Sequence, residues 1–188
     1  MNKLFLLDAY ALIYRSYYAF IKNPRINSKG LNTSAIIGFV NTLQEVLEKE
    51  QPTHLGVAFD PHGPTFRSDA FPEYKAQREA TPEDIKRAIP IIKELLEAYH
   101  IPVLQVDGYE ADDVIGTLAT RLGNVCSGSI DTKAIEVFML TPDKDYGQLV
   151  SDQVKIFRPR HGGGYETMGP KEVCEKYGLR KPAKSSTF

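Results

Sequence analysis

Acidic residues follow four short apolar runs of this chain, at the point where each run ends. The runs are Lys3–Leu7, His54–Phe59, Ile101–Val106 and Ile135–Leu140. The acids that follow them are Asp8, then Asp60, then Glu110 with Asp112 and Asp113, and finally Asp143 with Asp145. If the runs are parallel strands, their carboxyl ends meet at one edge of a sheet, and the carboxylates converge there. Such close like charges repel by about 4 kcal/mol per pair, so the usual reason to gather them is a divalent metal ion.

The segments between these runs have the apolar spacing and the capping residues of helices. We expect helices over 9–20, 33–50, 81–99, 110–122, 144–150 and 170–177, and a fifth strand over Val154–Arg158. The inner face of the second helix is expected to carry Ile37, Val40, Leu43 and Leu47. Pro90 predicts a kink or a restart in the third helix. Alternating strands and helices predict an α/β fold, with three layers (α/β/α) around a mostly parallel central sheet.

Bulk properties exclude several classes of protein. The 188 residues are enough for one domain, and the net charge of −1 provides no global attraction for nucleic acid or membrane. Such a partner would need a local patch. Cys126 and Cys174 have no metal or disulfide spacing, which is compatible with a reducing cytoplasm. No apolar stretch has the length of a signal peptide or a membrane span, so no membrane partner is expected.

Each acid also has a plainer interpretation as a helix cap or a solvated charge. Asp107 with Glu110 three residues later is close to a capping box. Asp143 could cap the short helix that follows it, with Asp145 in the first turn. The aspartates after the first two runs open no obvious capping pattern. Taken singly, a cap or a solvated charge is the commoner role, but the joint pattern favours metal.

A site made of carboxylates without histidine or cysteine suits Mg²⁺ or Mn²⁺ rather than zinc. More acids than one ion can use predict two ions about 4 Å apart, as in phosphoryl-transfer enzymes. One ion would lower the pKa of an attacking water, and the other would neutralise charge on the leaving oxygen. Glu110 and Asp113 share a helix face. Asp112 points elsewhere and should serve a different ion or act through water.

The segment Pro61–Ala80 is long, polar and without a clear period, and loops of this length in compact domains are usually functional or disordered. It mixes cations with aromatic residues, namely Arg67, Lys75 and Arg78 with Phe71 and Tyr74. This mixture is typical of a binder of single-stranded or frayed nucleic acid. Composition alone favours an ordinary solvated loop. Beside a carboxylate cluster, however, a phosphodiester needs cations as well as metals.

Several motifs of the chain occur together in a known family. They are Leu6-Leu7-Asp8-Ala9-Tyr10 with Tyr14-Arg15, Thr33–Phe39, Phe59-Asp60, Thr65-Phe66-Arg67 with Pro72-Glu73-Tyr74-Lys75-Ala76-Gln77-Arg78, Gly108-Tyr109-Glu110-Ala111-Asp112-Asp113, and Thr141-Pro142-Asp143-Lys144-Asp145 with Gln148-Leu149. In this order the chain resembles the 5′ nuclease domains of bacterial DNA polymerase I, in the flap endonuclease group of PIN-like nucleases. The resemblance covers nearly the whole chain.

The resemblance implies the N-terminal resolvase-like fold of 5′ nucleases and a structure-specific 5′–3′ exonuclease or flap endonuclease. Such an enzyme hydrolyses phosphodiester bonds in DNA with a 5′ flap or 5′ end, by a two-metal mechanism that uses Mg²⁺ or Mn²⁺. The substrates include RNA primer–DNA junctions, in primer removal and DNA repair. Polymerase domains would be fused downstream, in a bacterial cytoplasmic protein associated with the nucleoid.

The same resemblance implies roles for individual residues. The metal ligands would be Asp8, Asp60, Glu110, Asp112, Asp113, Asp143 and Asp145. Catalytic roles would fall to Asp8, Asp112, Lys75 and Arg78, of which Lys75 and Arg78 contact the scissile phosphate. Nucleic acid would be bound by Arg15, Arg67, Tyr74, Lys75 and Arg78, with Tyr74 stacking near a flipped-out nucleotide.

One departure from the family pattern concerns the end of the chain. Family members continue into a Gly-Asp-x-x-Asp-Asn segment and a helix–hairpin–helix-like element, which supply further acids and a grip on the duplex. This sequence stops at Phe188. We therefore expect a nuclease domain over residues 1–180, a tail over 181–188, weak binding of the second metal, and reduced or absent activity in this chain.

Three other functions compete with this interpretation. A small PIN-type ribonuclease also uses an acidic quartet, but it should not need the Pro61–Ala80 segment. A haloacid-dehalogenase-type phosphatase uses a strand-end aspartate as nucleophile, but it has a second acid two residues later, where this chain has Tyr10. A catalytically inactive DNA-binding fragment would bind nucleic acid without metal-dependent cutting.

Overall fold

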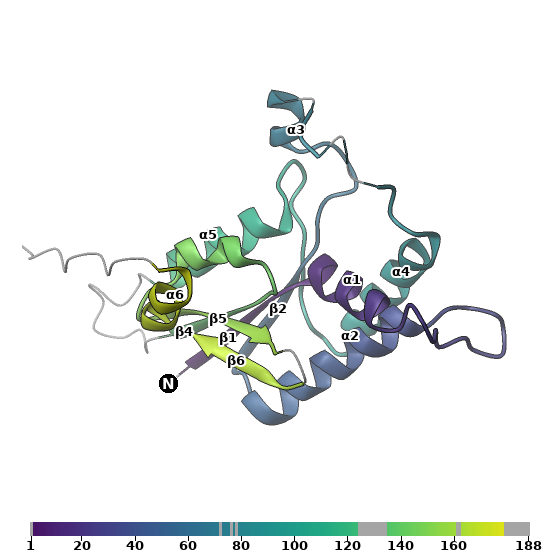
Figure 1. Cartoon of the computed structure of the whole chain (residues 1–188), viewed down its shortest axis with the longest axis horizontal. Coiled ribbons are helices and arrows are strands. Elements are labelled where there is room, and N and C mark those ends of the chain that lie inside the picture. Colours follow the sequence, from purple (N-terminus) through teal and green to yellow (C-terminus); the bar gives the residue numbers. More distant parts are fainter. Residues whose placement is uncertain are drawn as a thin grey trace, which may run out of the picture.

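The computed structural model describes residues 2–71, 73–75, 77, 79–123, 135–160 and 163–178. Within them lies one six-stranded sheet with helices on both faces (Figure 1). The strands are β1 (Asn2–Asp8), β2 (His54–Ala58), β3 (Val103–Leu104), β4 (Ile135–Leu140), β5 (Val154–Pro159) and β6 (Tyr165–Met168). Their order is β3-β2-β1-β4-β5-β6, and only the β5–β6 pair is antiparallel. The predicted three-layer α/β fold with a mostly parallel sheet is confirmed.

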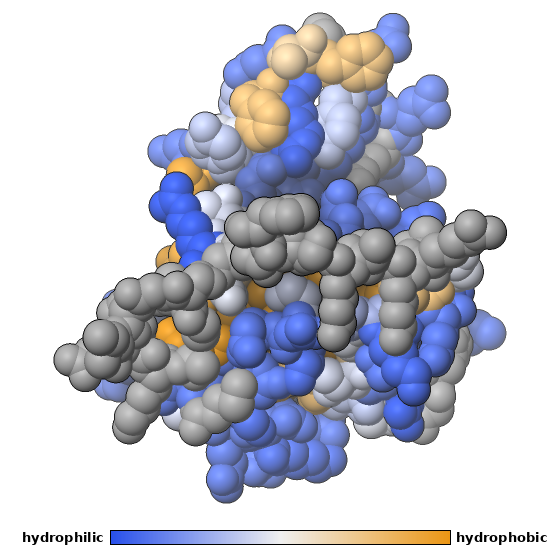
Figure 2. All heavy atoms as spheres, turned by 90° about the vertical axis from the view of Figure 1, so that its left-hand side faces the viewer, coloured by the Kyte–Doolittle hydropathy of each residue, from blue (hydrophilic) through white to orange (hydrophobic). Residues whose placement is uncertain are grey.

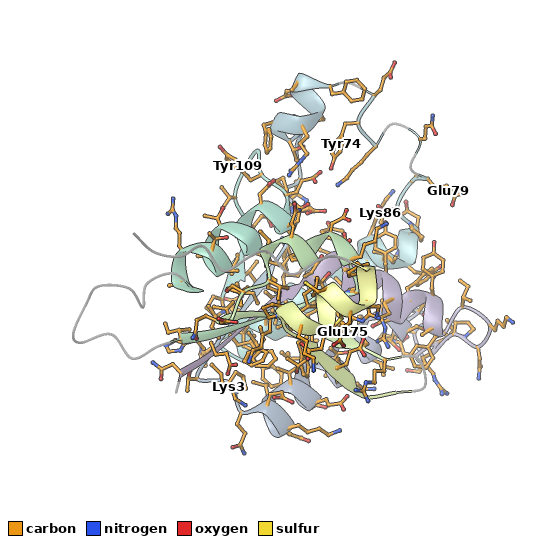
Figure 3. The ribbon with its side chains drawn as sticks, turned by 60° about the vertical axis from the view of Figure 1, so that its left-hand side comes forward. Lys3, Tyr74, Glu79, Lys86, Tyr109 and Glu175 are labelled. Atoms are coloured by element: carbon orange, nitrogen blue, oxygen red, sulfur yellow. The ribbon has the colours of Figure 1, made fainter. Side chains whose placement is uncertain are left out.

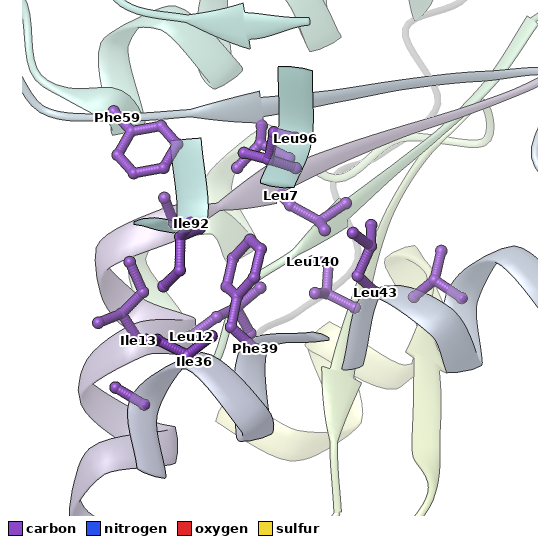
Figure 4. Packing of buried hydrophobic residues seen from close by; sticks show 14 of the residues in the cluster. Leu7, Leu12, Ile13, Ile36, Phe39, Leu43, Phe59, Ile92, Leu96 and Leu140 are labelled. Atoms are coloured by element: carbon purple, nitrogen blue, oxygen red, sulfur yellow. The ribbon is translucent and has the colours of Figure 1, made fainter. Parts of the chain in front are cut away.

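The helices divide between the two faces of the sheet, because alternate side chains of each strand point to opposite sides. The helical elements are α1 (Ala9–Ala19), α2 (Ser34–Glu45), the π-helical turn η1 (Val46–Glu50), α3 (Phe66–Ala70), α4 (Glu83–Ala98), α5 (Ala111–Gly123), the 3₁₀ helix η3 (Lys144–Leu149) and α6 (Pro170–Tyr177). On one face, α1, α2 and α4 enclose a core around Phe5 and Leu7 (Figure 4). On the other face, α5, η3 and α6 cover Leu4 and Leu6.

The register of the central strands places their carboxyl ends at the same level. Asp8 at the end of β1 pairs with Ala58 at the end of β2, and Leu7 pairs with Leu140 at the end of β4. The residues that follow each of these strands therefore emerge at one edge of the sheet, as the sequence pattern predicted. This edge positions the candidate site.

One residue of the second helix differs from the prediction, whereas Val40, Leu43 and Leu47 contact the core as expected. The buried apolar side chains of this helix include Ile36, Phe39 and Leu43, whereas Ile37 is 38% exposed. The placement of Ile37 on the inner face was therefore wrong by one residue. Ile36 and Ile37 are adjacent, and the apolar spacing allows either of them on the inner face. In the structure Ile36 is the buried one.

Other differences concern the ends and the continuity of elements. The helix α4 continues through Pro90, so the expected restart is wrong; this proline is on the exposed side, where its ring does not meet the core. The third strand covers only Val103–Leu104 of the predicted Ile101–Val106. It lies at the edge of the sheet, where strands are often short. Neither β6 nor the short helix α3 was predicted. Among the described residues, none of the helices has the length and apolarity that a membrane crossing requires.

Close packing of α1 on α2 generates a stability prediction at Gly38. A Cβ atom added there would lie 2.5 Å from the Cβ of Ser16 and 2.6 Å from its Oγ. We expect Gly38→Ala to lower the free energy of unfolding by about 1–2 kcal/mol, because overpacking exceeds the gain in helix propensity. Urea unfolding would measure the change.

The matched control for this substitution is Gly63→Ala, because an added Cβ at Gly63 meets nothing within 4 Å. Its free energy of unfolding should stay within about 0.5 kcal/mol of the unsubstituted protein. A Gly38→Ala protein that is more stable than the unsubstituted one would show that the two helices can separate at no cost, contrary to this packing.

Candidate active site at the carboxyl edge of the sheet

Asp8 joins the end of β1 to the start of α1. Its Oδ1 accepts a hydrogen bond from the backbone N–H of Ala11 (3.1 Å), so it caps α1, although the sequence showed no obvious capping pattern there. Its Oδ2 accepts from the hydroxyl of Thr141 (3.3 Å), which directly follows β4. Thr141 is fully buried and was not predicted. Its position after the fourth apolar run, level with Asp8 in the sheet, was the available signal.

The other acids also serve local structure. Asp60 accepts a hydrogen bond from the backbone N–H of Ala111 (2.8 Å), which ties the end of β2 to the start of α5. Asp143 caps η3 by accepting from the N–H of Asp145 (2.9 Å), as its plainer interpretation predicted. The capping box expected at Asp107 is wrong, because α5 begins at Ala111 and Asp107 lies outside it.

Asp113 reaches back to the helix start instead, and accepts from the backbone N–H of Glu110 (3.0 Å). The helix start that a side chain caps is therefore at Glu110, three residues after Asp107. A cap role for Asp8, Asp60, Asp113 and Asp143 does not remove them from the sheet edge. It fixes the backbone beneath each carboxylate.

Crowding of like charges at this edge raises the pKa of two of the aspartates. Burial, together with the negative charges of Asp60 and Asp112, raises the pKa of Asp8 to about 6. Burial, and then the charge of Asp113, raises the pKa of Asp112. The carboxylates of Asp8, Asp60 and Asp112 are therefore close enough to affect one another. This agrees with the expectation that the acids after these strands meet at one edge of the sheet.

Tyr146, in η3, lies at the centre of this convergence. It is 3% exposed, and its hydroxyl has no hydrogen-bond partner among the described residues. The pKa of Tyr146 is raised, first by burial and then by the charges of four carboxylates, those of Asp8, Asp112, Asp143 and Asp60. No sequence signal marked this tyrosine, because it sits in a short 3₁₀ turn without periodicity.

Arg67 reaches the acids from the Pro61–Ala80 segment. Its guanidinium binds Asp113 through both terminal nitrogens, with N–O distances of 2.5 and 2.7 Å. It also lies 3.5 Å from Glu110 and 3.8 Å from Asp112. Although burial opposes the effect, this pairing lowers the pKa of Asp113. The bidentate geometry is the one that arginine also offers to phosphate.

Glu110 is held by two further residues of the same segment. The Nζ of Lys75 lies 2.7 Å from Oε1 of Glu110, and the hydroxyl of Tyr74 donates to Oε2 (3.0 Å). Glu110 itself is only 6% exposed. Two residues predicted to bind nucleic acid, Lys75 at the phosphate and Tyr74 by stacking, thus contact a predicted metal ligand. Figure 3 shows Tyr74 and Tyr109 at the end of the molecule that carries α3.

The predicted ligands surround one region without being assembled into a metal-binding group. Over the described ranges, no three His, Cys, Asp or Glu side chains lie close enough together to hold an ion. Glu110 and Asp113 instead pair with Lys75 and Arg67, and Asp8, Asp60 and Asp143 accept backbone hydrogen bonds. An open groove of about 510 Å³ lies at this edge, and its lining includes Arg67, Asp112, Asp113, Asp143, Asp145 and Tyr146.

Two predicted nucleic-acid contacts are not seen in this arrangement of described residues. Arg15 is exposed on α1, about 10 Å along the helix axis from Asp8, and its charge acts on Tyr165 of β6. Arg78 lies outside the described residues, as do the tail at 181–188 and the few residues before it. The roles of Arg15 and Arg78 therefore stay predictions.

Exposed aromatic side chains stand beside the acids. The rings of Phe66 and Tyr109 are 5.5 Å apart, and they are 47% and 50% exposed. The backbone N–H of Phe66 donates to the carbonyl of Gly108 (2.9 Å), which fastens α3 to the segment before α5. Figure 2 shows apolar side chains at the top of the molecule, where α3 lies, above a largely hydrophilic surface. Neither Phe66 nor Tyr109 was predicted as a site residue.

The donors at the sheet edge fit a hard divalent cation. All are oxygen atoms, and the buried hydroxyl of Tyr146 is an orphaned polar group that ordered water around a cation would satisfy. The raised pKa of Asp8 shows that its charged carboxylate is destabilised, first by burial and then by the charges of Asp60 and Asp112. A divalent cation would remove this cost.

Comparison with known proteins gives the family. The chain is 40% identical to DNA polymerase I of Geobacillus stearothermophilus over 180 residues, which is 95% of this chain and 19% of that protein. It is 38% identical to a 5′-3′ exonuclease of Aquifex aeolicus over 179 residues, covering 95% of this chain and 57% of the relative. The chain thus spans about a fifth of the polymerases and somewhat more than half of the exonuclease.

Solved structures share the fold. The T5 D15 protein co-crystallised with metal ions superposes with a TM-score of 0.70 at 19% identity, covering 94% of this chain and 61% of that one. The catalytic core of Rad2 in complex with DNA gives a TM-score of 0.53 at 19% identity, covering 96% of this chain and 50% of the other.

The sequence profile described as "5'-3' exonuclease, N-terminal resolvase-like domain" matches residues 3–178. The match includes every predicted site residue, from Asp8 to Asp145. With this profile, the 40% identity to a DNA polymerase I and the shared sheet topology, the chain belongs to the family of 5′-3′ exonuclease N-terminal resolvase-like domains.

Proposed function

We propose that the chain forms the N-terminal domain of a structure-specific 5′–3′ exonuclease or flap endonuclease that hydrolyses phosphodiester bonds in DNA. The observation that carries the proposal is the meeting of strand-end carboxylates with cations of the Pro61–Ala80 segment. Arg67 lines the groove together with Asp113, and Lys75 pairs with the neighbouring Glu110. A phosphodiester nuclease needs both kinds of group, because the metal-binding carboxylates must be balanced by cations that hold the phosphate.

Two divalent cations, Mg²⁺ or Mn²⁺, would be held at the sheet edge. Their ligands, directly or through water, would be Asp8, Asp60, Glu110, Asp112, Asp113, Asp143 and Asp145. When bound, such cations lower the pKa of an attacking water and neutralise charge on the leaving oxygen. The T5 D15 protein, whose fold is shared, was co-crystallised with metal ions, which supports this assignment.

The cations of the Pro61–Ala80 segment would exchange partners when substrate and metal bind. In the structure, Arg67 pairs with Asp113 and Lys75 with Glu110. Divalent cations would compensate these carboxylates, so that the guanidinium and the ammonium could turn to the phosphate of the substrate. Arg78 would join Lys75 at the scissile phosphate. We therefore interpret these two ion pairs as the contacts that Arg67 and Lys75 make before substrate binds.

The aromatic side chains beside the groove would bind unpaired nucleotides. Phe66, Phe71 and Tyr109 expose about half of their surface, and the guanidinium of Arg67 lies 4.7 Å from the centroid of the Phe66 ring. Base–aromatic stacking beside a cationic groove is typical of proteins that bind single strands. The single strand of a 5′ flap or a frayed 5′ end has such unstacked bases, whereas a blunt duplex does not.

The wider setting follows from the relatives. Several matched proteins are named DNA polymerase I, and this chain aligns with about a fifth of their length. We therefore infer that the chain acts beside polymerase domains, on RNA primer–DNA junctions and repair intermediates at the bacterial nucleoid. Rad2, which shares the fold, was crystallised in complex with DNA, and this supports DNA as the substrate.

Incision of a 5′-flapped duplex tests this function. Under single-turnover conditions with excess protein, which detect the reduced activity expected of this chain, we expect slow Mg²⁺-dependent cutting at the flap junction. Asp8→Asn and Asp112→Asn should each lower the rate roughly 100-fold or more, because loss of a metal ligand removes several kcal/mol of transition-state stabilisation. A gel assay with labelled flap DNA, and the same flap made of RNA, would measure the rates.

The control for these variants is Asp152→Asn, an exposed aspartate in the turn before β5. Its rate should equal that of the unsubstituted protein. If the unsubstituted protein cuts no faster than Asp8→Asn, the metal-dependent nuclease is refuted. Flap binding without any cutting would indicate the inactive DNA-binding fragment instead.

Stability of the metal-free protein should depend on pH through Asp8. Its carboxyl has a pKa of about 6 in the folded chain and 3.8 ordinarily, so the folded state binds its proton more tightly than the unfolded state. The free energy of unfolding therefore falls as pH rises from about 4 to 6, and the cost is fully present above pH 6. We expect Asp8→Asn to be more stable than the unsubstituted protein by about 1–2 kcal/mol at pH 8.

This difference in unfolding free energy should shrink toward zero as the pH falls to about 4. Urea unfolding with a chelator present, at several pH values, would measure it. Asp152→Asn carries the same chemical change at the surface, and its stability should run parallel to that of the unsubstituted protein. An Asp8→Asn variant less stable at pH 8 would contradict the charge crowding described at this edge.

A further inference from the structure

The hydroxyl of Tyr146 is a polar group whose position the family assignment does not explain. The residue is 3% exposed, and its Oη is buried without a hydrogen-bond partner among the described residues. Leaving a buried hydroxyl unsatisfied costs about 1–3 kcal/mol relative to an apolar side chain of the same shape. Phenylalanine would fill the same space without this cost, so the hydroxyl calls for a partner that the described residues do not supply.

The surroundings of Tyr146 show which kind of partner would fit. Tyr146 belongs to the same buried cluster as Ala58, two residues before Asp60, and Ala111, which directly precedes Asp112. Tyr146 also lines the same groove as Asp112 and Asp143. The charges of Asp8 and Asp60 act on it as well. The hydroxyl is thus close to carboxylates from four chain segments but within hydrogen-bonding distance of none.

When a buried hydroxyl is close to carboxylates but too far away to donate to them directly, a water molecule can bridge the two groups. A water that accepts from this hydroxyl keeps its second lone pair for a cation and both of its O–H groups for donation to carboxylates. Hydrogen bonds of this type orient the ligands of a metal and tune its affinity.

We propose that Tyr146 is a positioning residue for the divalent cations of this site, and that its hydroxyl hydrogen-bonds an ordered water in their hydration shell. The proposal rests on the proposed function, since it presumes that the carboxylates hold a divalent cation. It goes beyond that function because Tyr146 is no carboxylate and carries no charge. Its role is to fix the water and, through it, the carboxylates of β1, the β2 end and η3.

Titration of the full chain with Mn²⁺ alone tests this role, by calorimetry and by the relaxation of water protons around the bound ion. Tyr146→Phe should weaken Mn²⁺ binding about 3- to 10-fold, which is the range expected for one lost hydrogen bond to the shell of a metal. The relaxation enhancement per bound ion should also change, because the exchange of the ordered water changes. The metal-free stability of the variant should be equal or higher.

The control is Tyr177→Phe, because Tyr177 packs near Gly147 on the same 3₁₀ helix but is 37% exposed. Its affinity for Mn²⁺ should match that of the unsubstituted protein. A Tyr146→Phe variant with unchanged Mn²⁺ affinity and unchanged relaxation overturns the positioning role and leaves the nuclease standing. If the unsubstituted chain binds no Mn²⁺, the proposed function and this inference fail together.

Discussion

The parallel alignment of β1 with β2 and β4 is the constraint on which the site depends. It places Asp8, the Asp60 turn and Thr141 at one level of one sheet edge. Burial of Asp8, and then the negative charges of Asp60 and Asp112, raise its pKa to about 6, which records the cost of placing a carboxylate here. The fold maintains this cost because the buried cores on the two faces of the sheet fix the strand register.

Two kinds of compensation act at this edge in the metal-free protein. Backbone N–H groups at the starts of α1, α5 and η3 donate to Asp8, Asp60 and Asp143. Side-chain cations from the Pro61–Ala80 segment pair with Glu110 and Asp113. The interpretation of the acids as helix caps and their interpretation as metal ligands are therefore compatible. A cap fixes the backbone, and the remaining oxygen lone pairs stay available to a cation.

The sequence predicted the sheet edge because strand length, polarity and the acids that follow each run are local properties. It placed Asp8 and Asp143 correctly for that reason. It could not predict that Arg67 pairs with Asp113, since this contact joins residues 46 positions apart through side-chain geometry. Nor could it predict Tyr146, whose importance lies only in where its hydroxyl is buried. Ile37 was misplaced because one residue of helix rotation changes its exposure but hardly its pattern.

Lys75 and Arg67 pair with Glu110 and Asp113, two carboxylates that we propose as ligands of a divalent cation, so the side-chain cations and the metal compete for them. The most direct measurement compares Mn²⁺ affinity of the unsubstituted chain and of Lys75→Met by electron paramagnetic resonance. The account predicts saturable binding that is several-fold tighter in Lys75→Met, because a competing positive charge at Glu110 has been removed. No saturable binding, or equal affinity in the two proteins, would contradict it.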